Sequence, residues 1–557
     1  MRRSSIGLLA SLLLACESPV PESFSPQASG PRRVIIVGMD TVRADHMGFM
    51  GHPGGLTPSL DAVAESSIVF ERAWAPAPRT RPSFRSATTG RWPIPGRSAP
   101  TLGALLGGHG FQTAGFVANV QLSEQLGFAT GFDTWILDNM ATADAQVDAA
   151  LEWLQQREQA DALLSLHVMD PHIFYTPPEP FTDRFTDLQD RQGMPDRYNR
   201  ELVIKQDQRG LLSDAQKRWI QGRYQGEIAF MDQELGRFVD AVDQLPGQTW
   251  MIFHSDHGEE FWDHGGFEHN HSLHDELLSA VLLVRPPLGR SVSAARISRP
   301  VSLADIPPTV LALMEIPKGT WPTFDGLDLS PLWATGGDDA LEKQLSARPL
   351  QIGHMMYSRE QWGVIRGDDK YIVTTETGEV AWTHQGEART GSDDGLEGAL
   401  SEATGWPVLR GWRLSFRDLE APLELRFKDS VVRATVVDPE ALRMRRANLA
   451  WGERPSRTPD DIVALQLSED GRTLKVIPGR SPTGVVFVSM DVAANPLRSG
   501  CVEDGDAPLL AGKQQICGAA VILSAGPYVD QPHTEFGEAP EPDPNNIETL
   551  RMLGYLD

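Results

Sequence analysis

The sequence predicts an α/β protein, with a doubly wound sheet that has helices on both faces and a smaller antiparallel β domain after it. Between about residues 33 and 320, short apolar runs of strand length alternate with helical stretches, which is typical of a doubly wound sheet. After about residue 375 the texture changes to polar and apolar residues that alternate with period two. That period indicates antiparallel strands.

Two of the apolar runs end in residue types that bind metals. Residues 34–39 precede Asp40, and residues 250–255 precede Asp256 and His257. Because open α/β sheets carry their chemistry just beyond the carboxyl ends of the strands, these side chains are expected to meet at one edge. The pattern predicts a divalent metal site, and the alternative is that these residues are only turn residues after each strand.

The remaining elements follow in chain order. In the first part, the pattern predicts a strand at 163–166, an amphipathic helix at 224–242 and a strand at 281–284. In the second part, period-two alternation or short apolar runs predict strands at 412–416, 423–427, 431–437 and 485–488. We therefore expect a main domain over 33–375, an accessory β-rich domain over 376–530, and a linker with a C-terminal helix over 531–557.

Length and charge limit the functional classes. A chain of 557 residues is longer than one ordinary domain, which favours one large domain and one smaller domain. The formal net charge of −25 argues against a nucleic-acid partner and against electrostatic membrane binding, because both need a basic surface. An anionic substrate remains compatible, since a bound cation inverts the local field.

The N-terminus has the pattern of an export signal. Two arginines precede a short apolar stretch that closes at Cys16, and the stretch is too short for a membrane span. Residues 1–15 resemble a bacterial lipoprotein signal, which implies lipidation at Cys16, and residues 16–32 form a flexible tether. An ordinary signal peptide is the alternative. Glu17 after the cysteine favours an exported protein anchored in the outer membrane.

The other two cysteines lie late in the chain. In an oxidising compartment, Cys501 and Cys517 are expected to form a local disulfide. Two buried free thiols are the alternative.

Several segments, taken in order, resemble the sulfatase family of the alkaline phosphatase superfamily. The match covers roughly residues 33–320 and the tail, and it implies an alkaline-phosphatase-like fold. The segments that carry it are Asp40-Thr41-Val42-Arg43-Ala44-Asp45, Thr57-Pro58-Ser59-Leu60-Asp61, Thr80-Arg81-Pro82-Ser83, His167-Val168-Met169-Asp170-Pro171-His172, Ser255-Asp256-His257-Gly258-Glu259 and Leu553-Gly554-Tyr555.

The resemblance implies a metal centre and a nucleophile. Asp40, Asp256 and His257 match the family's metal ligands, and Thr80 is expected to bind the same metal through its hydroxyl. Carboxylates with an imidazole suit Zn²⁺ or Mn²⁺ better than an all-oxygen Ca²⁺ site, although the ligand set does not name the ion. One metal ion is expected. The alternative is a second ion held by His172, His269 and His271, with Asp170 as a further ligand.

Thr80 stands at the nucleophile position of the family. True sulfatases carry Cys or Ser there, which is oxidised to formylglycine. Threonine lacks the primary carbon that this conversion requires, so direct attack by the Thr80 hydroxyl is expected instead. The structural alternative is that Thr80 caps the helix that follows it.

Two positions depart from the family pattern. Thr41 stands where many sulfatases have a second metal-binding Asp, and Phe84 stands where the family has an arginine. The adjacent Arg85 is the expected substrate-binding residue, although one step along a helix turns a side chain by about 100°. Arg79 and Arg81 are other candidates for holding the anion.

Histidines are dense after the second strand. Residues 254, 257, 264, 269, 271 and 274 are all His. By resemblance, His172 and His271 are expected to be catalytic, one of them as the proton donor to the leaving group, and His269 is expected to contact the substrate.

The sequence therefore predicts a metal-dependent hydrolase that cleaves sulfate or phosphate esters of small molecules or glycans. Two alternatives remain: a non-catalytic envelope binding protein with the same fold, and a transferase of phosphoglycerol or phosphoethanolamine groups.

Overall fold

The computed structural model describes residues 30–94, 97, 99–290, 295–334, 337–353, 360–375 and 377–406, and then residue 468 and the strands between residues 408 and 529. Cys16, Cys517 and the expected C-terminal helix lie outside the described residues, as does the side chain of Cys501. The lipidation and disulfide predictions therefore stay predictions.

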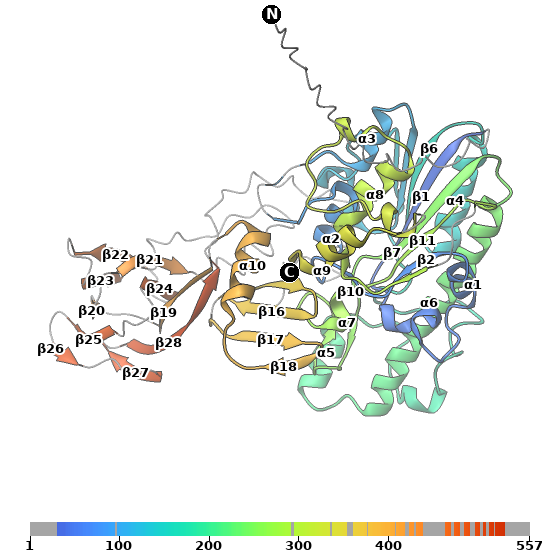
Figure 1. The fold of residues 1–557 in the computed structure, drawn as a ribbon. Helices are drawn as coiled ribbons and strands as arrows, with labels where there is room; N and C mark the ends of the chain where they lie inside the picture. Colours follow the sequence, from blue (N-terminus) through green and yellow to red (C-terminus); the bar gives the residue numbers. More distant parts are fainter. Residues whose placement is uncertain are drawn as a thin grey trace, which may run out of the picture.

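The core of the protein is an eight-stranded mixed sheet in the order β12-β2-β11-β7-β1-β6-β4-β5 (Figure 1). Its centre is β1, which runs parallel to β6 on one side and to β7 on the other. In contrast, β11 runs antiparallel to both of its neighbours. The strands are β1 (Arg32–Met39), β2 (Ile68–Phe70), β4 (Gln112–Val117), β5 (Thr134–Leu137), β6 (Ala162–Val168), β7 (Gln248–Ser255), β11 (Leu282–Arg285) and β12 (Ala295–Ile297).

Helices cover both faces of this sheet, as the α/β prediction requires. Ile35 and Val37 of β1 face a core shared with α4 and α6, whereas Val34 and Ile36 face a second core shared with α3 and α8. This alternation follows from the period of two along a strand. The helices are α1 (Pro58–Ala64), α2 (Thr80–Thr89), α3 (Leu102–Gly107), α4 (Ala143–Gln155), α5 (Arg200–Gln208), α6 (Asp214–Val242), α7 (Asp275–Leu278), α8 (Ile306–Leu313), α9 (Asp339–Ala347) and α10 (Asp394–Thr404).

The long helix α6 begins ten residues earlier than the predicted 224–242. Ser213 and Gln216 form a reciprocal capping box at its N-terminus, which satisfies backbone N–H groups that would otherwise lack partners. Its buried face includes Tyr224, Ile228 and Leu235, at the three- and four-residue spacing of an amphipathic helix.

Antiparallel sheets make up the rest of the described chain. One sheet, in the order β14-β15-β16-β17-β18, packs with α10, and the predicted boundary at residue 375 falls in the turn between its paired strands β16 and β17. Two further five-stranded sheets follow, β21-β24-β19-β28-β27 and β22-β23-β20-β25-β26, and all their pairings are antiparallel. These sheets confirm the prediction of an antiparallel β region.

The bounds of these strands, and of the shorter strands near the main sheet, are as follows: β3 (Ala73–Trp74), β8 (Glu260–Phe261), β9 (Phe267–Glu268), β10 (Ser279–Ala280), β13 (Val301–Ser302), β14 (Leu350–Ile352), β15 (Gln361–Arg366), β16 (Asp369–Thr374), β17 (Val380–His384), β18 (Glu387–Arg389), β19 (Val408–Arg417), β20 (Leu423–Phe427), β21 (Val431–Val437), β22 (Val463–Leu467), β23 (Thr473–Pro478), β24 (Gly484–Met490), β25 (Pro496–Cys501), β26 (Gly505–Ala507), β27 (Gly512–Ile516) and β28 (Ala519–Val529).

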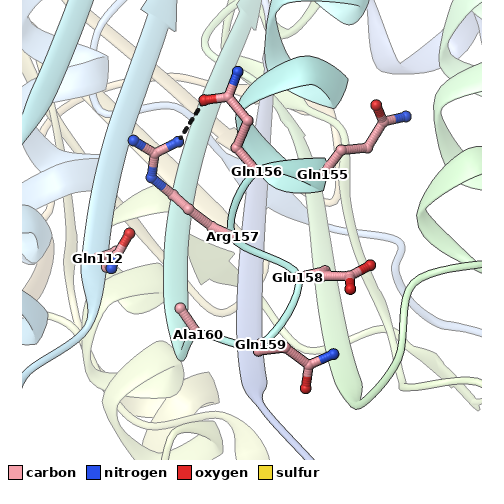
Figure 2. A pocket seen from close by; sticks show the side chains of 7 residues that line it. All are labelled: Gln112, Gln155, Gln156, Arg157, Glu158, Gln159 and Ala160. Atoms are coloured by element: carbon pink, nitrogen blue, oxygen red, sulfur yellow. Dashed lines mark hydrogen bonds between the residues drawn. The ribbon is translucent and has the colours of Figure 1, made fainter.

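A polar surface hollow of about 660 Å³ lies at the amino-terminal edge of the main sheet (Figure 2). It is lined by Gln112, which begins β4, and by residues 155–160 between α4 and β6. Figure 2 shows the Arg157 guanidinium donating to the side-chain carbonyl of Gln156. This hollow is at the opposite end of the strands from Asp40 and Asp256.

Near the carboxyl end of β1, Gly38 has no room for a side chain. A Cβ atom at this position would lie 2.4 Å from Cζ of Phe84 in α2. Replacing Gly38 with alanine is therefore expected to destabilise the fold by about 1–3 kcal/mol, the usual range for overpacking. Urea unfolding measures this change.

Gly398→Ala is the matched control, because Gly398 lies in α10 with open space around its Cα. Alanine there is expected to be neutral or stabilising by up to about 1 kcal/mol. Adding Phe84→Leu to Gly38→Ala should recover part of the loss. Wild-type stability in Gly38→Ala would show that this close approach is wrong.

Candidate active site

The register of the two central strands brings the predicted metal ligands together. Met39 at the end of β1 lies opposite Ser255 at the end of β7, so Asp40 and Asp256 follow side by side. One ligand atom each from Asp40, Asp256 and His257 lies within 4.8 Å of the other two, and all three residues are buried. The sequence prediction of these three residues as one group is thus met by the geometry.

The hydrogen bonds around the carboxylates leave one oxygen of each without a partner. Asp256 Oδ1 accepts from the backbone N–H groups of Thr41 (3.1 Å) and His257 (2.9 Å), and Asp40 Oδ2 accepts from Asn119 Nδ2 (2.8 Å). Asp40 Oδ1 and Asp256 Oδ2 are buried without a hydrogen bond. Buried carboxylate oxygens in this state are strongly unfavourable unless a cation lies between them.

The third donor atom is a neutral imidazole nitrogen. His257 Nδ1 donates to the carbonyl of Gly258 at 2.9 Å, so the lone pair is on Nε2. That atom lies 3.4 Å from Asp256 Oδ2 and 3.8 Å from Asp40 Oδ1. Burial lowers the pKa of His257 to about 4, which keeps the ring neutral and ready to bind a metal at neutral pH.

The two carboxyl groups differ in their electrostatics. Burial, followed by the charge of Asp40, raises the pKa of Asp256 well above its usual value. Burial also acts against ionisation of Asp40, but the adjoining imidazole of His167 and the other nearby histidines hold the pKa of Asp40 below its usual range. Two oxygens and one imidazole nitrogen around this point fit a divalent cation, and they suit Zn²⁺ or Mn²⁺.

Thr80 lies against this group. It is the first residue of α2, it is buried, and its Oγ1 lies 3.5 Å from His257 Nε2. The N-cap residue of α2 is Arg79, so the capping alternative does not account for the threonine. Arg79 is also buried, and its charge contributes to the low pKa of His257, which places a cation close to the site.

The structure does not bring Arg85 to the site. Arg85 Nη2 donates to the carbonyl of Leu126 at 2.8 Å, and its guanidinium lies 5.0 Å from the centre of the Phe128 ring. One step along α2 turns the side chain toward that neighbouring segment. Arg81 likewise donates to the Gln121 side chain at 2.7 Å and 3.1 Å, so Arg79 is the arginine of this segment that adjoins His257.

Two further histidines line the group. The His269 ring lies 4.5 Å from that of His257 and 5.2 Å from that of His172, measured between centroids. His172 Nδ1 donates to the carbonyl of Ile173, and His172 Nε2 is buried without a hydrogen bond. His172 therefore lies where the sequence predicted it, close to the metal ligands through His269.

His269, rather than His271, faces the metal ligands. His271 Nε2 lies 2.7 Å from Glu260 Oε2, and its Nδ1 lies 3.2 Å from the carbonyl of His269. Asn270 between them has a φ of 72°, which turns the chain and separates the two rings. The structure thus places His271, which was expected to be catalytic, away from the metal ligands. It places His269, which was expected to contact the substrate, beside them.

A buried chain of hydrogen bonds orients His269. Its Nδ1 lies 2.9 Å from Glu259 Oε1, and the Tyr175 hydroxyl donates to Glu259 Oε2 at 2.8 Å. This arrangement leaves Nε2 on the opposite side of the ring. Sequence reasoning missed Tyr175 and Glu259 as site residues, although Glu259 belongs to a segment that resembled the family.

The residues proposed for a second metal ion do not form a group of three ligand atoms within 4.8 Å of one another in the described part of the chain. Asp170 Oδ1 accepts from the backbone N–H of Ala143 at 3.0 Å, at the start of α4. Within the described part of the chain, Asp40, Asp256 and His257 form the one group whose ligand atoms meet the 4.8 Å distance. One metal site is therefore the arrangement that the geometry supports.

Metal binding is expected to strengthen as pH rises from 5.5 to 8. The raised pKa of Asp256 means that this group stabilises the metal-free fold most below its unfolded pKa of about 3.9, and that stability is lost as pH rises through the folded value. A cation displaces the proton, whereas His257 is already neutral above pH 5.5. Calorimetry with Mn²⁺ in two buffers of different ionisation enthalpy measures the released proton.

Asp256→Asn is the control for this measurement, since an amide carries no titratable proton. We expect weak binding without proton release. Wild-type affinity that stays constant over this pH range would contradict the assignment of the raised pKa to Asp256.

Comparisons with known proteins agree with this geometry. The family model "Sulfatase" matches residues 32–316. An uncharacterized sulfatase, YidJ, of Escherichia coli strain K12 is 23% identical over 344 residues, which cover 51% of this chain and 68% of the relative. An ulvan-active sulfatase of Formosa agariphila is 23% identical over 356 residues, covering 58% and 68%.

A solved structure shows the same fold. It comes from Bacteroides thetaiotaomicron, is associated with the metabolism of multiple glycosaminoglycans, and superposes with a TM-score of 0.51 at 15% identity, covering 67% of this chain and 96% of that one. Since the family model spans more than half of the 557 residues, this chain belongs to the sulfatase family.

Proposed function

We propose that this protein is a metal-dependent hydrolase of sulfate or phosphate esters in which Thr80 is the nucleophile. The observation that carries the proposal is the position of Thr80 Oγ1, 3.5 Å from His257 Nε2, beside the unpartnered oxygens of Asp40 and Asp256. A hydroxyl in contact with a metal-ligand group is placed for nucleophilic attack.

Asp40, Asp256 and His257 would hold the cation, with Thr80 adjoining them. When bound, a divalent cation neutralises the charge of the ester's non-bridging oxygens and lowers the pKa of a hydroxyl group beside it. Arg79 adds a positive charge next to His257. At this site the ester would be held with its sulfur or phosphorus facing Thr80 Oγ1.

The reaction then proceeds in two steps. Thr80 Oγ1 releases its proton to water and bonds to the sulfur or phosphorus, while the bond to the leaving alcohol breaks and the alcohol oxygen takes a proton from His269. In the second step water attacks the ester on Thr80, which releases sulfate or phosphate; one proton of that water restores the Thr80 hydroxyl and the other returns to His269. This route needs no aldehyde, which fits the secondary carbon of Thr80.

His269 is the proposed proton donor to the leaving alcohol. Burial lowers the pKa of His269 and raises the pKa of Glu259, so the pair shares one proton between Glu259 and Nδ1 with little charge on either group. A second proton on Nε2 is then the one available to the leaving group. His172, next to His269, is proposed as a substrate contact.

For the substrate we propose a small-molecule or glycan ester. The ulvan-active sulfatase among the relatives supports a glycan, whereas the threonine in place of a formylglycine precursor supports a phosphate ester. No helix in the described part of the chain is long and apolar enough to cross a membrane. Export with lipidation at Cys16, and anchoring in the outer membrane, remain proposals from the N-terminal pattern.

Removing the Thr80 hydroxyl is expected to abolish turnover. Thr80→Val keeps the shape of the side chain, and we expect it to lower kcat by about 10³-fold or more, the scale of losing a nucleophile. Thr80→Ser keeps a hydroxyl and should retain measurable activity. The assay uses nitrophenyl sulfate, nitrophenyl phosphate and bis-nitrophenyl phosphate with protein loaded with Zn²⁺ or Mn²⁺.

The outcome of this assay distinguishes the hydrolase from the two alternative functions. Undiminished turnover in Thr80→Val would refute the nucleophile assignment. A folded, metal-loaded wild-type protein without turnover of any ester would favour the non-catalytic binding protein. Transfer of the phosphoryl group to an added alcohol, instead of to water, would favour the transferase.

His269 and His271 form a natural matched pair for the proton-donor role. His269→Gln should lower kcat/KM about 10²- to 10⁴-fold for an alkyl ester, whose leaving group needs a proton. The loss should be much smaller for a nitrophenyl ester, because nitrophenolate leaves without one. His271→Gln should show no such dependence on the leaving group, and equal behaviour of the two variants would overturn the assignment.

A further inference from the structure

Two buried histidines lie symmetrically on either side of Gly38. In the central sheet, Gly38 of β1 pairs with His167 of β6 and with His254 of β7. The Phe84 ring lies between the two imidazoles, 5.0 Å from the centre of the His167 ring and 5.4 Å from that of His254. Because Gly38 has no side chain, Phe84 fills the space above it and packs against both rings.

The two histidines hold opposite tautomers. His167 Nδ1 accepts from the backbone N–H of Ala118 at 3.3 Å, so the ring proton of a neutral His167 is on Nε2. His254 Nδ1 lies 3.2 Å from the carbonyl of Ser255, so its proton is on Nδ1. Backbone groups therefore decide which nitrogen of each ring carries the proton.

Of the two rings, His167 is the one with a nitrogen close to a metal ligand. Its Nε2 lies 3.3 Å from Asp40 Oδ2, just beyond the usual hydrogen-bond range, and it has no other hydrogen-bond partner. The same oxygen accepts from Asn119 Nδ2 at 2.8 Å. Ala118 and Asn119 are consecutive residues after β4, so one short segment fixes the His167 tautomer and supplies the second donor.

These two donors determine which oxygen of Asp40 is free. Both lie next to Oδ2, and Oδ1 is left buried without a hydrogen bond and close to Asp256 and His257. Groups that orient a metal ligand in this way commonly change metal affinity by about 10- to 100-fold.

We propose that His167 is a positioning residue of the metal site, which directs Asp40 Oδ1 to the cation by donating to Oδ2. Phe84 holds the His167 ring in place by packing between it and His254. The phenylalanine that replaces the family's arginine thus supports the site through packing. This proposal rests on the proposed metal site at Asp40, Asp256 and His257.

The experiment measures Mn²⁺ affinity by calorimetry on metal-free, full-length protein carrying single substitutions. His167→Leu removes the donor and is expected to weaken Mn²⁺ binding about 10- to 100-fold. His254→Leu is the matched control, because His254 also pairs with Gly38 and also packs against the Phe84 ring. This substitution should change Mn²⁺ affinity by less than about threefold. His167→Gln offers an amide N–H in place of Nε2 and should restore most of the loss.

Circular dichroism and thermal unfolding first establish that each variant is folded. If His167→Leu does not fold, Asn119→Leu removes the other donor to the same oxygen and is expected to weaken Mn²⁺ binding similarly. Equal losses in His167→Leu and His254→Leu would overturn the proposal in favour of packing alone, as would unchanged affinity in His167→Leu. Absence of Mn²⁺ and Zn²⁺ binding by the wild-type protein would instead refute the metal site of the proposed function.

Discussion

The pairing of β1 with β7 is the constraint on which the site depends. Met39 opposite Ser255 sets Asp40 and Asp256 side by side, and both carboxyl groups are buried there with one unpartnered oxygen each. A slip of one residue would turn every side chain of the strand to the other face. Alternate residues of β1 are buried in two different hydrophobic cores, which makes such a slip very unfavourable. Hydrophobic packing therefore determines where the polar side chain of Asp40 lies.

The sequence predicted the parts of the site that depend on strands. Asp40, Asp256 and His257 follow apolar runs, and a buried parallel strand delivers its next residues to one known edge. The prediction that Arg85 contacts the substrate was not met because Arg85 lies on a helix, where a shift of one position turns the side chain by about 100°. Its guanidinium therefore reaches Leu126 and Phe128, while Phe84 takes the position next to the sheet.

Loop residues were the least predictable part. His269 and His271 are two apart, and their directions depend on the left-handed backbone of Asn270 and Glu268, which no spacing rule reveals. The start of α6 was missed because residues 214–223 are mostly polar, yet the Ser213–Gln216 capping box begins the helix there. The roles of Asn119 and His167 depend on contacts between segments far apart in the chain, which the sequence does not contain locally.

The site contains several buried acidic side chains, and they differ in whether the protein itself provides partners for their carboxyl groups. Glu259 is held by Tyr175 and His269, and Glu268 lies 2.5 Å from Arg200 at the start of α5. Glu259 and Glu268 therefore each have a partner side chain within 3 Å, whereas Asp40 Oδ1 and Asp256 Oδ2 have no hydrogen bond and lie 3.8 Å and 3.4 Å from His257 Nε2. Since isolated buried charge is so unfavourable, the two unsatisfied oxygens mark where an external cation completes the structure. Thr41, with its β-branched side chain at a φ of 58°, bears local strain while its N–H binds Asp256, so the fold accepts a conformational cost to keep that geometry.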